Sequence, residues 1–255
     1  MPGPPNTLIN DIYEKTGFFP TWLPGDVITL GMVGTRIGPK FRNIKILTKY
    51  GIPFDTEMGQ GMPDMNYRSR FGVTVKGKAA GEKIRDSTIP VANAGLIISL
   101  GFDGSYIFNL RDCVQRNIQD REGLGRKILE RYYKKDWNFD SMIIDSVVEA
   151  QKSLIVVSER MFTKAEIAVK GATPTIGQVT DWTVEVVSEI CNAGVIYIRS
   201  NKPSTPLYSL MKIKDSWIER ITNGPEIDYT QFHEDIFEKA KKYLEKPPKD
   251  KKRRI

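Results

Sequence analysis

The residues that could do chemistry in this chain are few and lie far apart. The single histidine, His233, is followed by a glutamate as in zinc-binding helices, but the second histidine expected one turn later is absent. Two cysteines, Cys113 and Cys191, lack metal-ligand spacing and predict reduced thiols in a cytosolic protein. A cysteine–histidine nucleophile would need His233 to meet one of them in the fold, and nothing in the sequence indicates such a meeting.

Glycines and carboxylates give no stronger chemical signal. Gly31, Gly34 and Gly38 follow neither the dinucleotide-binding spacing nor that of a P-loop, so this segment predicts a loop that bounds a strand. The carboxylates of residues 55–64 are scattered and form only a weak acid–base or metal pattern. We therefore expect a protein without a catalytic site, a metal or a cofactor.

Positive charge is concentrated in two zones. The net charge is +7; residues 36–85 hold eleven Lys and Arg against four Asp and Glu, and residues 239–254 hold nine against two. Clustered positive charge favours anionic partners, either phospholipid headgroups or nucleic acid. A solvated face with a frayed tail is the alternative interpretation.

The composition predicts a cytoplasmic chain. A mean hydropathy of −0.35 and the lack of a long apolar run argue against a transmembrane helix, which needs roughly 20 apolar residues. Residues 1–6 show neither the basic nor the apolar region of a signal peptide.

The elements that must position these residues are mostly strands. Helices are predicted over residues 7–16, ended by Gly17, over 120–135 and over 226–246. The predicted strands cover residues 27–33, 41–47, 67–78, 96–102, 106–110, 142–150, 153–158, 165–169, 182–190, 195–199 and 207–213.

The connections complete this prediction. Residues 34–40 are expected to form a loop and 51–65 to be irregular, and Asp103-Gly104 predicts a tight hairpin between its flanking strands. The three strands between 142 and 169 are expected to form a meander. Because strands and helices do not alternate, we expect an α+β fold with a twisted, mostly antiparallel central sheet, amphipathic hairpins, a central helix and a C-terminal helix.

These patterns predict three regions. We expect residues 1–225 to form one α+β domain, residues 226–246 an amphipathic helix, and residues 247–255 a disordered basic tail.

Two alternating runs between residues 67 and 110 carry the clearest functional signal. They predict an amphipathic hairpin with a glycine-rich, charged connection. Its apolar face holds Tyr67, Phe71, Val73, Val75, Leu96, Ile98, Leu100 and Phe102. Its polar face holds Arg68, Arg70, Thr74, Lys76 and Lys78.

Three kinds of protein use such a hairpin. In a nucleic-acid platform the aromatic and basic side chains share one face, whereas here they lie on opposite faces. A membrane-spanning strand needs about 9–11 alternating residues, which residues 67–78 provide. A soluble sheet with one wet face alternates in the same way.

The order of elements resembles the pore-forming domain of the gasdermin family, of the bacterial type with a short C-terminal segment. The resemblance covers residues 7–215 and is one of topology and scattered pattern. Its parts are residues 23–30 (Leu-Pro-Gly-Asp-Val-Ile-Thr-Leu), a first hairpin in 67–81 and 93–102, a helix in 123–135, and a second hairpin in which 142–150 returns through 153–160. The chain differs from bacterial members in lacking a cysteine near its start, and it has no room for the large inhibitory domain of mammalian members.

The resemblance implies a latent pore-forming protein, in the family a membrane-permeabilising effector of cell death or antiviral defence. It would be cytoplasmic when latent and would lie in the inner (plasma) membrane when active, as a homo-oligomer on anionic lipids. The lipid-facing residues would be Phe71, Val73, Val75, Leu96, Ile98 and Leu100. Arg68, Arg70, Lys76 and Lys78 would face the lumen or the headgroups.

The resemblance also implies an inhibitory C-terminal segment. Phe232, Ile236 and Tyr243 of the predicted C-terminal helix would pack against the hairpins until a protease removes the chain after about residue 225. A soluble binding module for nucleic acid or another anionic partner is the alternative, with nucleic acid the less favoured partner.

Overall fold

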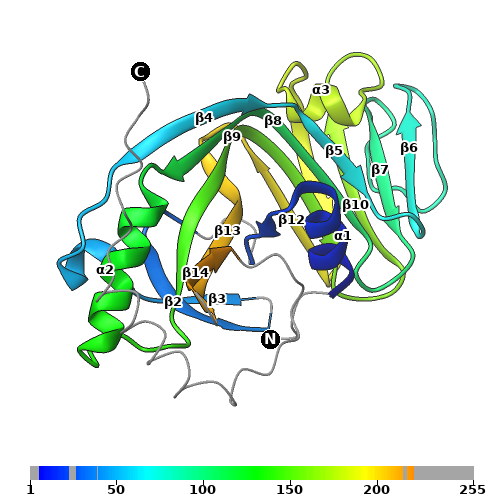
Figure 1. Cartoon of the computed structure of the whole chain (residues 1–255). Coiled ribbons are helices and arrows are strands. Elements are labelled where there is room, and N and C mark those ends of the chain that lie inside the picture. The colour runs from blue at the N-terminus through cyan, green and yellow to red at the C-terminus, as the bar shows by residue number, and fades with distance from the viewer. Residues whose placement is uncertain (1–5, 23–26, 39, 215–216, 221–255) are drawn as a thin grey trace.

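The computed structural model describes residues 6–22, 27–38, 40–214 and 217–220, which form two antiparallel sheets and three α-helices (Figure 1). The helices are α1 (Asn6–Thr16), α2 (Arg121–Tyr133) and α3 (Ile176–Thr180), and a 3-10 turn, η1, covers Leu47–Tyr50. The fold is therefore α+β with mostly β structure, as the sequence predicts.

The strands divide unequally between the sheets. The large sheet contains β1 (Phe19–Pro20), β2 (Met32–Ile37), β3 (Lys40–Ile46), β4 (Thr56–Met62), β5 (Met65–Arg68), β8 (Tyr106–Ile118), β9 (Met142–Ser158), β12 (Val195–Ser200), β13 (Ser204–Lys214) and β14 (Trp217–Arg220). The small sheet has the order β11 (Val186–Cys191), β10 (Thr163–Val169), β7 (Ala94–Leu100) and β6 (Val73–Lys78).

The long strand β9 is the centre of the large sheet. It pairs with β8 over most of its length and also with β2, β12 and β13. The sequence predicts two strands here because the polar pair Gln151-Lys152 interrupts the apolar residues. The strand nevertheless continues, since Gln151 is exposed and Lys152 forms an ion pair with Asp112 at 3.2 Å. The predicted meander is wrong, because β10 belongs to the small sheet.

Three hydrophobic clusters hold these layers together. The first packs α2 against β2, β9 and β13, and the second packs α1 against β5, β8, β9 and β12. The third lies between the two sheets, on the face of β8 and β9 opposite to α1. The small sheet therefore covers one face of the large sheet, and α1 covers the other (Figure 1).

Local sequence determines the two longer helices as predicted. In α1, Leu8 and Ile12 are buried one turn apart, and the left-handed Gly17 ends the helix with its N–H donating to the Tyr13 carbonyl at 2.7 Å. In α2, Asp120 caps the first turn by accepting from the Gly123 N–H at 2.7 Å. The predicted apolar stripe of α2 is buried: Leu124, Ile128, Leu129 and Tyr132.

The glycine-rich segment around residue 34 is a strand, not the predicted loop. β2 and β3 form a hairpin that uses residues 34–37 and 40, and the predicted strand over 27–33 begins only at Met32. Gly34 is required inside β2 because a Cβ there would lie 2.1 Å from the Arg42 carbonyl oxygen. Close backbone approach, rather than phosphate binding, explains this glycine.

Two further connections differ from the prediction. The segment 51–65, expected to be irregular, contains β4, which pairs with β8. The Asp103-Gly104 turn joins β7 of the small sheet to β8 of the large sheet, so these strands do not form the predicted hairpin. The predicted reversal at Asp103-Gly104 is therefore wrong, and the chain passes there from the small sheet to the large sheet.

The predicted strand over 67–78 is also divided. Its first part is β5 in the large sheet and its second part is β6 in the small sheet, separated by a turn with a left-handed Gly72. β6 nevertheless pairs with β7, as the amphipathic hairpin requires.

The C-terminal predictions have mixed outcomes. The strands over 195–199 and 207–213 are confirmed as β12 and β13, whereas β11 occupies only the end of the predicted strand 182–190. Helix α3 was not predicted, because one turn is too short to show a helical period. The predicted helix 226–246, with Phe232, Ile236 and Tyr243, and the tail 247–255 lie outside the described residues.

Candidate functional site: two insertions in the large sheet

Every strand of the small sheet lies in one of two insertions between neighbouring strands of the large sheet. Residues 69–105, the first insertion, connect β5 to its antiparallel neighbour β8 and contain β6 and β7. Residues 159–194, the second insertion, connect β9 to its antiparallel neighbour β12 and contain β10, α3 and β11. The small sheet is therefore built from two excursions of the same kind.

Both insertions leave the large sheet at the same end. Arg68 pairs with Ile107, Tyr106 with Val157, and Ser158 with Val195, so the ends of β5, β8, β9 and β12 lie side by side. Figure 1 shows the small sheet standing at this end of the large one.

The ladder between the insertions continues the central ladder of the large sheet. Tyr106 pairs with Val157 at the end of the β8–β9 ladder, and Leu100 pairs with Thr163 at the start of the β7–β10 ladder. The two segments between these pairs, 100–106 and 157–163, are equally long, so the pairing register is the same on both sides of the bend. In its pairing register the small sheet therefore continues the large sheet, with a bend where the two sheets join.

Four connections cross this bend. Three of them are called the hinge loops, residues 69–72, 101–105 and 159–162, and the fourth, residues 192–194, returns the second insertion to β12. Hydrogen bonds keep their chains side by side, because the Ser158 N–H donates to the Ser105 carbonyl and the Gly104 N–H donates to the Ser158 carbonyl, each at 2.9 Å. Gly72, Gly104 and Phe162 adopt left-handed backbone conformations there. Left-handed residues change the chain direction sharply, which is what the bend requires.

The predicted lipid-facing residues fall into two groups. Five lie in the cluster between the two sheets, where Val73 and Val75 are partly buried and the others are almost completely buried: Leu96, Ile98 and Leu100. Phe71 is separate from them, because it lies in a hinge loop with 69% of its surface exposed.

The predicted basic residues are also placed differently from one another. Arg68, Arg70 and Lys76 are exposed. Lys78 is only 1% exposed, and its Nζ donates to the carbonyls of Asn93 at 2.5 Å and Pro90 at 3.0 Å. Lys78 therefore does not reach solvent in this structure, which corrects its assignment as a residue free to meet a lumen or a headgroup.

The connection between β6 and β7 folds back over the outer face of the small sheet. Ile89 of this connection packs on Ile97 and Ala168. Buried Glu166 of β10 accepts from the Thr88 N–H at 2.6 Å and forms an ion pair with Lys164 at 2.6 Å. Burial alone would raise the pKa of Glu166, but the hydrogen bonds from Lys164 and Thr88 outweigh it and hold the pKa below its ordinary value.

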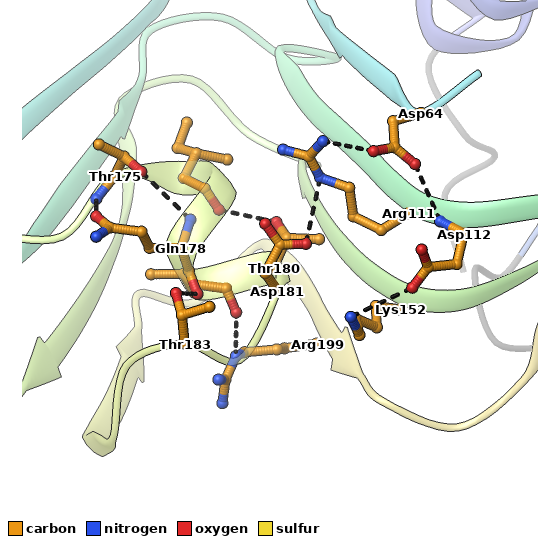
Figure 2. Close-up of polar contacts among 12 residues, drawn as sticks. Asp64, Arg111, Asp112, Lys152, Thr175, Gln178, Thr180, Asp181, Thr183 and Arg199 are labelled. Atoms are coloured by element: carbon orange, nitrogen blue, oxygen red, sulfur yellow. Dashed lines mark hydrogen bonds and ion pairs between the residues drawn. The ribbon is translucent and has the colours of Figure 1, made fainter.

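Helix α3 of the second insertion is fixed to the large sheet. Thr175 and Gln178 form a capping box at its start, and Val179 is buried in the cluster between the sheets. Figure 2 shows Arg111 of β8 between two carboxylates, with its Nη1 2.7 Å from Asp64 and its Nε 3.5 Å from Asp181 at the end of α3. One guanidinium thus joins the β4–β5 connection, β8 and the second insertion.

A second arginine holds the other side of α3. The Arg199 Nε of β12 donates to the Val179 carbonyl at 3.0 Å (Figure 2). The guanidinium carbon of Arg199 lies 3.6 Å from the centroid of the Trp182 ring. On the first side of α3, the hydrogen bond from Arg111 is the main cause that lowers the pKa of Asp64. The contacts of Arg111 and Arg199 act as anchors for α3, because each charged group in them already has an oppositely charged or aromatic partner.

The nucleophiles of the described residues are poorly activated. Burial raises the pKa of Cys113 to about 12, and burial and Glu189 raise the pKa of Cys191, so both thiols stay protonated near neutral pH. Among the described residues no group of three His, Cys, Asp or Glu side chains could hold a metal ion. His233 lies outside the described residues.

One depression in the described surface has a volume of about 230 Å³ and lies between residues 27–29 and 203–205. Its only charged lining residue, Glu149, is engaged by Arg116 at 2.7 Å. This depression therefore offers a small molecule no converging set of free polar groups.

No protein-family model matches the chain, and no curated protein matches it. None of the described helices is both long and apolar enough to cross a membrane. The two insertions, their register and their side chains are the features from which a function can be inferred. The sequence signal for the second insertion is the alternation in residues 160–170, which predicts a strand of a meander equally well.

Proposed function

We propose that this protein is a latent pore-forming protein whose two insertions extend the large sheet across an anionic membrane. The observation that carries the proposal is the shared register of the β7–β10 and β8–β9 ladders. Straightening the hinge loops would turn two stacked sheets into one long sheet without breaking the pairing between the insertions. The outer ladders, β6–β7 and β10–β11, would have to shift register.

The first insertion has the side-chain pattern that such an extension requires. Its two arms, residues 70–81 after β5 and residues 92–103 before β8, contain 12 residues each. A membrane-spanning strand needs about 9–11 residues, so each arm is long enough. One face would be apolar or small: Phe71, Val73, Val75, Gly77, Ala79, Gly81, Ala92, Ala94, Leu96, Ile98, Leu100 and Phe102. The other would be polar or small except for Ile97: Arg70, Gly72, Thr74, Lys76, Lys78, Ala80, Asn93, Gly95, Ser99, Gly101 and Asp103.

The second insertion repeats this pattern. Its mostly apolar face would hold Met161, Thr163, Ala165, Ile167, Val169, Val184, Val186, Ser188 and Ile190. Its other face carries the charges: Arg160, Lys164, Glu166, Lys170, Glu185 and Glu189. Two hairpins of this kind in each copy, paired with those of neighbouring copies, would leave no sheet edge exposed to lipid.

The latent form hides a large part of these faces. Strand residues of both insertions form the small-sheet half of the cluster between the sheets and pack on Leu154 and Val156 of β9. Four other residues of these faces are exposed: Phe71, Phe102, Met161 and Ile190. Burying one such side chain contributes about 1.5–3 kcal/mol, so their release in water is costly and in lipid is not. The bend of the hinge loops thus decides whether one apolar surface is a protein core or a lipid contact.

The proposed hairpins differ from those expected from sequence. Residues 142–160, expected to form the second hairpin, are mostly the uninterrupted strand β9, and the second hairpin would instead be residues 159–194. The proposed trigger stays proteolysis near residue 225, outside the described residues.

Leakage from dye-filled anionic vesicles tests the proposal. The full chain and a truncation ending at Gly224 would be compared, and the truncation is expected to release dye and to form rings visible by electron microscopy. If both remain folded and neither releases dye, the proposal is wrong.

A further inference from the structure

The largest exposed apolar side chains of the hinge loops gather at one place. Phe71, Phe102, Met161 and Phe162 are 69%, 52%, 55% and 81% exposed. Phe71 and Phe102 lie in two of the hinge loops, and Met161 and Phe162 are neighbours in the third. The loops are in direct contact, because the Gly101 N–H donates to the Gly72 carbonyl at 2.6 Å and the Phe162 N–H donates to the Gly101 carbonyl at 3.4 Å. We call these four side chains, with Arg68, Arg70 and Arg160, the hinge rim.

The backbone of the hinge rim holds its apolar side chains outward. Phe162 has a φ of 56°, a left-handed conformation that costs a bulky residue about 1–2 kcal/mol. At Gly72 a Cβ would lie 2.5 Å from the Phe102 ring, so only glycine lets this ring occupy its place. A costly backbone conformation thus accompanies the most exposed of these side chains, Phe162, which is 81% exposed.

Arginines accompany the apolar side chains. The guanidinium carbon of Arg70 lies 5.4 Å from the centroid of the Phe71 ring, within range of a cation–π contact. Arg68 and Arg160 are exposed, and the acidic residues of the hinge loops are Asp103 and Glu159. The hinge rim is therefore an apolar surface with an excess of positive charge.

We propose that the hinge rim docks the protein on an anionic bilayer surface before insertion. Phenylalanine and methionine would enter the boundary between headgroups and acyl chains, and each nearby arginine would gain about 1 kcal/mol from the negative surface potential. Asp103 and Glu159 reduce this gain, so the four exposed apolar side chains would contribute much of the binding. A nucleic acid fits less well, because binding to its phosphate backbone depends mainly on positive charge, of which the hinge rim has only a small excess.

The position of the hinge rim supports a bilayer as its partner. The rim residues adjoin the ends of β5, β8 and β9, which lie beside the start of β12 at the place where both insertions depart. Docking there would place the roots at the membrane surface, with the extended arms directed into it. This role depends on the proposed pore function, but docking can be measured without leakage.

Vesicle flotation tests the docking. The full chain and the truncation ending at Gly224 would be mixed with phosphatidylcholine vesicles containing phosphatidylglycerol, and with pure phosphatidylcholine vesicles. In whichever form binds, Phe71→Ser with Phe162→Asn should weaken binding to the anionic vesicles on the order of tenfold or more. Asparagine tolerates the left-handed backbone at 162, so the variant should fold.

A matched control separates the hinge rim from general hydrophobicity. Ile37→Ser with Met58→Ser removes two apolar side chains of similar exposure, 61% and 67%, from the large sheet, and should leave binding unchanged. Equal loss in both double variants, no loss in the rim variant, or capture of a single-stranded oligonucleotide in place of vesicles would overturn the proposal.

The two proposals fail in different ways. Vesicle binding that needs the hinge rim, without leakage from the truncated chain, would support docking and overturn pore formation. Leakage together with undiminished binding of the rim variant would overturn docking alone.

Discussion

The two insertions are alike in topology and different in their anchors. Both join neighbouring strands at the same end of the large sheet and both contribute to the cluster between the sheets. Outside this cluster, two contacts hold the connection between β6 and β7 of the first insertion. Lys78 donates to the Asn93 carbonyl within the insertion, and the Thr88 N–H donates to Glu166 of the second insertion. The second is held directly to the large sheet by Arg111 and Arg199.

This difference indicates an order of release. The contacts of Lys78 and Glu166 join the connection of the first insertion to its own strands and to β10, and not to the large sheet. We therefore expect this connection to move together with the second insertion. The second insertion must separate from β8 and β12, which belong to the large sheet. We therefore expect the contacts of α3 to control opening, and those of Glu166 to have a smaller effect.

The insertions also differ in charge. Residues 69–81, the outer arm of the first insertion, contain three basic and no acidic residues, whereas residues 182–193, the outer arm of the second, contain two acidic and no basic residues. In a ring of copies arranged head to tail, these two arms would become neighbours. Unlike charges would favour that order, and like charges would disfavour the reverse pairing.

The largest expected effect comes from a charge on the apolar face. Val75→Asp should abolish leakage, because a charged side chain on the lipid face of a membrane strand costs about 2–4 kcal/mol near the midplane for the basic residues and somewhat less for aspartate. Thr74→Asp, on the polar face of the same strand, is the control and should retain leakage. Dye release with thermal unfolding measures both, and equal loss in the two folded variants would contradict the assignment of faces.

Charge reversal of the outer arms should have the next largest effect. Arg70→Glu with Lys76→Glu, and separately Glu185→Lys with Glu189→Lys, should each reduce leakage on the order of tenfold, because like charges would meet at every junction of a ring. An equimolar mixture of the two variants should recover it, since each copy then meets a complementary neighbour. If the mixture is as inactive as its components, the head-to-tail order is wrong.

Releasing α3 should have a moderate effect. Arg111→Gln removes the contacts with Asp64 and Asp181, which are partly exposed and together stabilise the fold by about 1 kcal/mol. Hydrogen exchange in residues 176–181 should accelerate, and the truncated chain should release dye faster. Arg126→Gln, which breaks an exposed pair on α2, should change neither. Unchanged exchange in the Arg111 variant would remove α3 from the proposed mechanism.

Acid should have the smallest effect. The pKa of Glu166 is lowered in the folded protein, so its contribution to stability is present above its unfolded pKa of about 4.3 and is lost as the pH falls through the lower folded value. Exchange of the Thr88 amide should therefore accelerate below about pH 4, and Glu166→Gln should flatten this dependence. A pH profile that is the same in both proteins would show that Glu166 does not hold the connection.

Part of the fold could be predicted from local patterns. Helices α1 and α2 follow from their apolar spacing and end residues, and the pairing of β6 with β7 follows from alternation. The division of residues 67–78 between two sheets could not be predicted, because a turn at Gly72 leaves the alternation of both halves intact. The second insertion escaped prediction for the same reason, since β10 alternates whichever sheet it joins.

The candidate site was predictable in its residue types but not in its geometry. Alternation identified Leu96, Ile98 and Leu100 as one apolar face, and they are buried together. It placed Lys78 on the polar face with equal clarity, yet carbonyl groups of the distant Pro90 and Asn93 enclose its ammonium. The hinge rim also depends on contacts between segments that are far apart in the chain.

Tyr67 packs in the second cluster and Val73 and Val75 in the third, so the face predicted across the turn at Gly72 is wrong. Within each strand, the sequence by itself determined which residues share a face, because a strand alternates its side chains with a period of two whatever it pairs with. It therefore specified two amphipathic segments and the separation of their charged and apolar sides. The tertiary structure decided which strands pair, where the chain bends and what covers each face, because these depend on contacts between residues distant in sequence. The shared register across the hinge, which carries the proposed function, exists only at that level.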